Sequence, residues 1–146
     1  MYKQTKQLLI IAITIISGYH LHCQTKNIDF QQKHVLLVYG GWYGHQPDAF
    51  GARMSNWFKK HNAKVTEAKK TNVYANEKIM NTVDFIVQSI TMSEISDKDL
   101  EGLRKAIEKG VGFAGCHGGL GDSFRDNNEY QYIVGGQFVK LSLIHI

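Results

Sequence analysis

Apolar and polar positions follow two different rhythms along the chain. Continuous apolar runs, bounded by glycine or polar residues, are typical of strands that are buried on both faces of a parallel sheet. Four such runs are present, of which the second is the weakest. They cover residues 34–39, 64–68, 83–90 and 111–115.

Apolar residues at helical spacing separate these runs. Pro47 and Asp48 open the first helix, because proline is tolerated in a first turn and an acidic side chain there suits the helix dipole. Positive charge at Lys59 to His61 ends it. Its apolar stripe predicts a buried face, made of Phe50, Met54, Trp57 and Phe58.

A second helix is predicted from Ser96 to a glycine stop at Gly110. Ser96 and Asp99 form a start similar to a capping box, with Asp in place of the preferred Glu or Gln. A shorter helical piece is predicted at residues 76–80. After a polar loop, residues 132–139 look like the beginning of another unit.

Strands and helices therefore alternate, without internal repeats or linker composition. This order predicts an α/β fold with a mostly parallel, doubly wound sheet. Ligands of such sheets bind beyond the carboxyl ends of the strands. Three loops at that edge are the candidate functional segments: residues 40–46, 89–94 and 115–122.

Residues 1–23 predict an export signal. Lys3 and Lys6 precede an apolar run at residues 8–16, which is too short to cross a bilayer of roughly 30 Å but suits a signal core of about 7–15 residues. The alternative, a buried N-terminal helix, is disfavoured because the run is apolar on every face. We therefore expect a periplasmic or extracellular protein, with cleavage near Cys23, no stable membrane insertion after signal removal, and lipidation as the less favoured option.

The last six residues, 141–146, show no relation to what precedes them. A DNA string that encodes them resembles a transposon-end adaptor used in library preparation. We interpret them as an adaptor-derived artefact, and the alternative is an ordinary terminal strand. On the favoured interpretation, the folded part comprises residues 24–140 and its sheet is incomplete at the C-terminus.

Composition changes once the two ends are set aside. The whole chain of 146 residues carries a formal charge of +4, which falls to +2 without the two lysines of the signal. Residues 24–140 keep four of the seven histidines and one of the two cysteines. This charge gives no reason to expect nucleic acid or an anionic membrane as a partner, and a single cysteine excludes an intramolecular disulfide.

Glycine and histidine gather where the predicted strands end. The segments that share this character are residues 35–41 with His45, 110–119, 122–125 with Glu129 and Tyr130, and 135–138. Together they resemble the ThuA-like (trehalose-utilisation) family over nearly all of residues 33–140. The resemblance implies the class I glutamine amidotransferase-like superfamily, a flavodoxin-like sheet with a strand–turn–helix elbow, and carbohydrate-related metabolism.

The elbow of that superfamily follows a glycine–x–nucleophile–x–glycine pattern, because glycines permit its sharp turn. Centring the pattern on Cys116 requires glycine at position 114, where alanine stands. Centring it on His117 places Gly115 and Gly119 correctly. His117 is therefore predicted at the elbow and Cys116 beside it, as a small buried thiol and not as a nucleophile.

Two histidines are the candidate catalytic residues. His117, and less firmly His45, could act as general acid and base or as ligands of a divalent metal. The structural alternative is that each only hydrogen-bonds neighbouring loops. A complete metal site needs a further ligand, and the nearby acidic candidates are Asp122, Asp126 and Glu129.

Other residues of the same loops are candidate carbohydrate contacts. Trp42 and Tyr43 could stack on a sugar ring or could cap the sheet edge. Arg125 could bind sugar hydroxyls or a carboxylate, or could pair with Asp122 or Glu129. Gly118 and Gly119 are further predicted contacts; neither they nor residues 40–41 match a nucleotide-binding fingerprint.

These observations favour an exported bacterial enzyme of the ThuA-like kind that acts on a sugar, with His117 at the elbow. The first alternative is an amidotransferase-type or peptidase-like hydrolase that uses Cys116. The second is a sugar-binding module without catalysis. The resemblance also implies that a complete triad would draw residues from later in the chain, so the chain as printed is predicted to be inactive.

Overall fold

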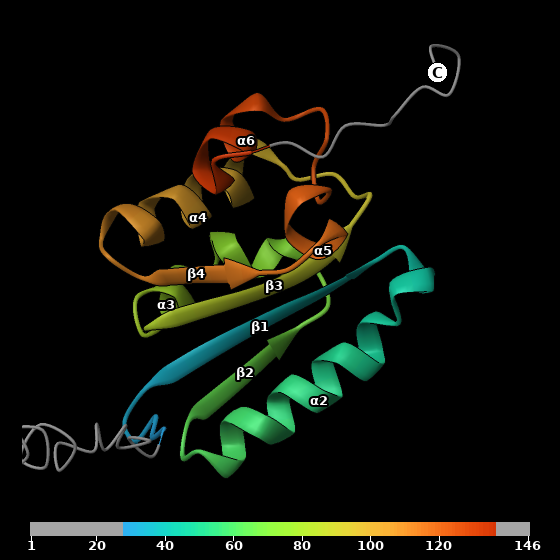
Figure 1. Cartoon of the computed structure of the whole chain (residues 1–146). Helices are drawn as coiled ribbons and strands as arrows, with labels where there is room; N and C mark the ends of the chain where they lie inside the picture. The colour runs from blue at the N-terminus through green and yellow to red at the C-terminus, as the bar shows by residue number, and fades with distance from the viewer. Residues whose placement is uncertain (1–27, 137–146) are drawn as a thin grey trace, which may run out of the picture.

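A computed structural model describes residues 28–136 of the chain. The predicted export signal (1–23) and the predicted adaptor-derived residues (141–146) lie outside these described residues, as does part of the predicted unit at residues 132–139. Within residues 28–136 the chain forms one four-stranded parallel sheet (Figure 1). The α/β class predicted from the sequence is confirmed.

The sheet has the strand order β2–β1–β3–β4. β1 (His34–Gly41) lies at its centre, parallel to β2 (Lys64–Ala68) and β3 (Phe85–Thr91), and β4 (Gly112–Gly115) pairs with β3. This is the order of a flavodoxin-like sheet, whose topological switch lies between β1 and β3. The four predicted strands are all present, with ends shifted by at most two residues.

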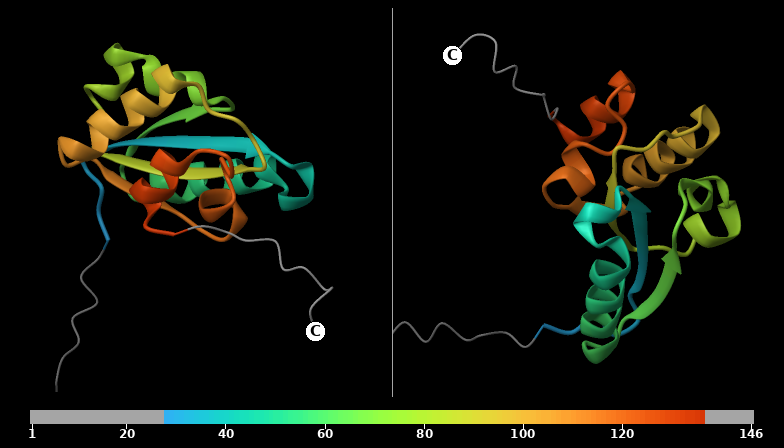
Figure 2. Two further views of the ribbon diagram at one scale, coloured as in Figure 1. Left: turned by 90° about the horizontal axis from the view of Figure 1, so that it is seen from above. Right: turned by 90° about the vertical axis from the view of Figure 1, so that its right-hand side faces the viewer.

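Helices cover both faces of the sheet (Figure 2). α2 (Pro47–Lys60) and the short α5 (Gly118–Gly121) lie on one face. α4 (Asp97–Glu108), the 3-10 helix η2 (Thr71–Ala75) and α3 (Glu77–Met80) lie on the other. The predicted double winding is therefore observed.

Two apolar clusters, one on each face, hold the layers together. On the α2 face, Phe58 packs on Leu37 and Val87, and on the α4 face Leu103 packs on Leu36 and Ile86. The buried positions of β1 alternate between the two clusters, because successive side chains of a strand point to opposite faces. Burial on both sides explains why β1 is apolar without interruption.

The helix starts depend on local hydrogen bonds. The Asp99 backbone N–H donates to Ser96 Oγ (3.2 Å), as the predicted N-cap requires. The reciprocal bond of a capping box is replaced, because the buried Asp99 carboxylate accepts a hydrogen bond from Thr71 Oγ1 (3.1 Å) in η2 instead. The α4 start is thereby tied to the connection that follows β2.

Two predictions about the helices are wrong in part. Trp57, predicted to lie in the core, is 38% exposed, because it lies in the last turn of α2 at the amino edge of the sheet, where its ring contacts Phe30 and His61. The segment after residue 122 is not only a polar loop: α6 (Asn128–Val134) begins there, capped by Asn127. No helix within residues 28–136 has the length and apolar character needed to cross a membrane.

Candidate functional site

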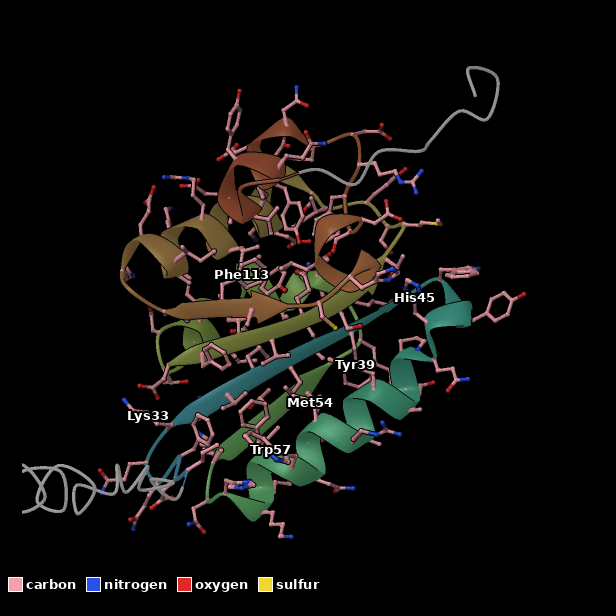
Figure 3. The ribbon with its side chains drawn as sticks, viewed as in Figure 1. Lys33, Tyr39, His45, Met54, Trp57 and Phe113 are labelled. Atoms are coloured by element: carbon pink, nitrogen blue, oxygen red, sulfur yellow. The ribbon has the colours of Figure 1, made fainter. Side chains whose placement is uncertain are left out.

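The three loops singled out by the sequence meet at the carboxyl edge of the sheet. β1 leads into the short 3-10 helix η1 (Tyr43–His45), β3 leads into residues 92–94, and β4 leads into α5. This edge lies on the right of the sheet in Figure 1, and Figure 3 shows His45 there beside α5. The Trp42 backbone N–H donates to Thr91 O (3.0 Å) and joins two of the loops.

His117 stands at the sharp turn between β4 and α5. Its backbone has φ 50° and ψ −141°, a combination that costs a non-glycine residue of order 1–3 kcal/mol. The α5 turn closes behind it, since Leu120 N–H and Gly121 N–H both donate to His117 O (3.2 and 2.9 Å). The strand–turn–helix geometry predicted for this position is therefore present, with His117 and not Cys116 at its tip.

Strained backbone gathers at this edge. Within residues 28–136, five non-glycine residues have positive φ, and three of them belong to the loops around His117. Those three are Gln46, Met92 and His117. Such strain persists only where the surrounding structure enforces it, and it is typical of functional sites.

His45 is brought against His117. The two ring centroids lie 5.2 Å apart with the ring planes at 66°. His45 Nδ1 is hydrogen-bonded to Thr91 Oγ1 (2.8 Å), which fixes the ring orientation, and no hydrogen bond to Nε2 is found among the described residues. Thr91 was not among the predicted site residues, because nothing in its sequence context distinguishes it from any other strand-terminal threonine.

Gly118 and Gly119 are buried, and the site uses their lack of a side chain. A Cβ on Gly118 would lie 2.8 Å from His45 Cε1, and a Cβ on Gly119 would lie 2.9 Å from Ser89 Cα. The two glycines let α5 press against β3 and let the His45 ring approach the His117 turn. Substrate contact by these residues stays a prediction.

Trp42 and Tyr43 lie at the rim of the site. Trp42 is 46% exposed and packs its ring edge-on against His45 (centroids 4.9 Å apart), whereas Tyr43 is 85% exposed. Trp42 therefore serves as packing for His45 and still presents aromatic surface to solvent. Stacking on a sugar stays a prediction for both rings.

Arg125 pairs with Asp122. Two guanidinium nitrogens donate to the two carboxylate oxygens, one of them (Nη2 to Oδ2) at 2.9 Å, and the hydrogen bond raises the pKa of Arg125. Asp122 is almost fully buried, so the pair is part of the structure, and Glu129 turns instead toward Arg104 (3.5 Å). Of the two alternatives for Arg125, the structure shows the salt bridge.

The prediction of a buried Cys116 is wrong. Cys116 is exposed within the part of the chain that the structure describes. The physical reason is its position at the end of β4, the last strand of the described sheet, whose four residues are themselves only partly buried.

A buried polar network holds α5 in place. Gln88 Nε2 donates to Tyr130 Oη (2.6 Å) and to Ser123 Oγ (2.9 Å), and Gln88 Oε1 accepts from Tyr74 Oη (2.6 Å). Tyr130 Oη in turn donates to the carbonyl of Leu120 in α5 (2.8 Å), and burial raises the pKa of Tyr130 to about 12. The sequence patterns did not predict this network, although a glutamine inside an apolar strand is a signal for it.

The described residues supply two candidate ligands for a metal. No group of three or more His, Cys, Asp or Glu side chains within residues 28–136 is arranged to hold one. At this edge of the described sheet, His45 and His117 could donate imidazole nitrogens, and a zinc-type site needs at least one further protein ligand. A divalent metal at this edge stays a prediction.

The fold and the site together define an α/β protein with a flavodoxin-like sheet whose strand–turn–helix elbow carries a histidine. The family model ThuA, described as trehalose utilisation, matches residues 34–143. The chain therefore belongs to the ThuA family, which suggests a role in trehalose utilisation or carbohydrate metabolism. No curated protein and no solved structure gives a significant match.

Proposed function

We propose that the protein is an exported bacterial enzyme that acts on a sugar or glycoside, with His117 and His45 transferring protons at the carboxyl edge of the sheet. Family membership supports the substrate class. The observation that carries the assignment is the conformation of His117, whose strained backbone projects an imidazole from a tight turn next to a second histidine.

The pair suits acid–base chemistry. Imidazole exchanges protons near neutral pH, and a positioned histidine contributes typically 10²–10⁴-fold to a rate. Thr91 holds Nδ1 of His45, so the proton that His45 exchanges is the one at Nε2. His117, at the tip of the turn, is the group that meets the substrate first, and the exposed rings of Trp42 and Tyr43 border its approach.

Turnover of a panel of neutral sugars and glycosides tests the proposal. Because the chain as printed is predicted to be inactive, turnover is measured on a full-length ThuA homologue and on its variants at the positions equivalent to those named here. His117→Ala is expected to lower turnover about 10²–10⁴-fold without changing the melting temperature by more than a few degrees. His61→Ala is the matched control, since His61 follows α2 at the opposite edge of the sheet. Equal activity of the two variants contradicts the catalytic role, and sugar binding without any turnover favours the non-catalytic module.

A second candidate function rests on the exposure of Cys116. An accessible thiol next to the elbow could serve an amidotransferase-type or peptidase-like hydrolase, provided that a base lowers its pKa. Cys116→Ala separates the two candidates, because it abolishes turnover only if the thiol is the nucleophile. Retention of full activity in Cys116→Ala contradicts the hydrolase function.

Export is part of the same proposal. The basic and then apolar order of residues 1–16 supports it. Fractionation of cells that produce the full chain is expected to place the mature protein outside the cytoplasm, with a mass that corresponds to cleavage near Cys23. Uncleaved protein in the cytoplasm contradicts this part of the proposal.

A further inference from the structure

A cavity of about 300 Å³ opens at the carboxyl edge, on the other side of the β1 end from the histidines. Its walls come from the residues that follow β2 (Lys69–Asn72) and β3 (Ser93 and Glu94), and these connections lead to the α4 face of the sheet. His45 and His117 stand in connections that lead to the α2 and α5 face. Gly40 and Gly41 separate the two places.

The separating wall is thin. A Cβ on Gly41 would lie 2.0 Å from Thr91 O, so the ends of β1 and β3 are pressed together there. The same Thr91 holds His45 through its hydroxyl. A ligand in the cavity therefore lies one pair of strand ends away from the histidine pair.

The cavity lining is polar, and its charges are balanced. Ile90 is the single residue with an apolar side chain among the nine that line it. Lys70 and Glu94 bring one charge of each sign, and neither forms an ion pair with any described residue. Lys69 also lines the cavity, but its ammonium is bound to Asp48 (2.7 Å) at the start of α2.

This lining selects a class of ligand. An anion would be repelled by the carboxylate of Glu94 and a cation by the ammonium of Lys70, and the polar side chains of this lining offer an apolar group little to pack against. A sugar hydroxyl both donates and accepts hydrogen bonds, so it can bind the ammonium and the carboxylate together. The volume lies at the small end of the range for small-molecule sites, roughly 300–1,000 Å³, which suits one ring.

We propose that this cavity is a second carbohydrate subsite, which takes one neutral, polyhydroxylated ring of a substrate whose reacting part lies at His117. The inference rests on the proposed function only for the statement that the reacting part of the substrate lies at His117. Binding of a sugar ring in the cavity does not depend on that function. It predicts a preference for ligands of two rings over single sugars.

Calorimetric titration of the full chain with glucose and with neutral disaccharides, trehalose among them, tests the subsite. Wild type is expected to bind at least one disaccharide more tightly than glucose. Lys70→Met, which keeps the aliphatic stem and loses the donors, is expected to weaken disaccharide binding about tenfold, and Glu94→Gln by less. Lys60→Met is the control, because Lys60 is an exposed lysine in the last turn of α2.

Three results would overturn the subsite. The first is that wild type binds no disaccharide, and the second is that Lys70→Met and Lys60→Met bind disaccharide with equal affinity. The third is that inorganic phosphate displaces the disaccharide more strongly than glucose does. If His117→Ala keeps full turnover while Lys70→Met still weakens binding, the proposed function fails and the subsite stands. If His117→Ala loses turnover and Lys70→Met binds normally, the subsite alone fails.

Discussion

His34 and His117 lie at opposite edges of the same sheet, and their surroundings differ in almost every respect. His34 begins β1, is 6% exposed, and hydrogen-bonds Thr82 through Nδ1 (3.1 Å to O) and Thr66 through Nε2 (2.8 Å to Oγ1). His117 follows β4, is exposed, and has a strained backbone. Figure 3 shows the two edges, with Lys33 at one and His45 at the other.

The difference teaches how to tell a structural histidine from a candidate catalytic one. Both ring nitrogens of His34 are hydrogen-bonded, one to Thr66 in β2 and the other to Thr82 in the connection before β3, so the ring contributes to folding. The carboxyl edge instead accepts an unfavourable backbone conformation in order to place an imidazole, and this arrangement costs folding free energy. Substitution of His34 should therefore lower the free energy of unfolding, whereas a substitution that relieves the backbone strain at His117 should raise it.

The largest effect is expected for His34→Ala. It leaves a cavity among buried residues and removes the ring's hydrogen bonds, at a cost of about 2–4 kcal/mol in the free energy of unfolding. Urea denaturation measures it, with His61→Ala as the control at the same edge. If His34→Ala lowers the free energy of unfolding no more than His117→Ala does, the contrast between the two histidines is wrong.

The next effect concerns the network beneath α5. Tyr130→Phe removes one of the hydrogen-bond partners of the Gln88 amide and one of those of the Leu120 carbonyl in a buried network, at a cost of about 1–3 kcal/mol. Tyr132→Phe, on the same helix but 87% exposed, is expected to stay within about 0.5 kcal/mol of wild type. Equal effects of the two variants would show that the network does not hold this edge together.

His117→Gly is expected to stabilise the protein by about 1 kcal/mol while it removes the candidate catalytic group. Glycine adopts positive φ without strain, and this gain exceeds the entropy that glycine loses on folding. Parallel urea curves for His117→Gly and His117→Ala measure the difference between them. A glycine variant less stable than the alanine variant contradicts the assignment of strain.

The smallest expected effect is a pH dependence at the amino edge. Burial, as the largest cause, lowers the pKa of His34 below its ordinary value of 6.5. The unfolded chain then binds more protons than the folded one as the pH falls below 6.5, so this contribution to stability is complete above that pH and is lost on acidification. Unfolding free energies between pH 8 and 5 should show a shallower slope for His34→Gln than for wild type, and equal slopes would sink the idea.

Most of the fold was predictable because it depends on short-range patterns. The uninterrupted apolar run of β1 follows from burial on both faces of the sheet, and the apolar stripe of α2 follows from burial on one face of the helix. The hydrophobic patterns gave incorrect predictions where a helix begins or ends close to solvent. Trp57 fits the α2 stripe but is 38% exposed in the last turn of the helix. α6 begins among polar residues, and its Tyr130 is buried against Gln88, a partner far away in sequence.

The candidate site was predictable in position but not in contacts. Spacing of glycines placed His117, and not Cys116, at the turn, and the structure agrees. The exposure of Cys116 and the choice of Asp122 as the partner of Arg125 depend on which neighbours the fold supplies. Thr91 and Gln88 were missed for the same reason, since their partners His45, Ser123 and Tyr130 lie 35 to 46 residues away.

The sequence by itself determined the alternation of strands and helices, the three loops at the carboxyl edge and the residue at the tip of the elbow. Each of these is set by local sterics and by periodic burial, which a linear pattern records. The tertiary structure decided that His45 meets His117, that a buried network braces α5, and that a balanced polar cavity lies beside them. Those features depend on side chains that only parallel packing of distant strands brings together.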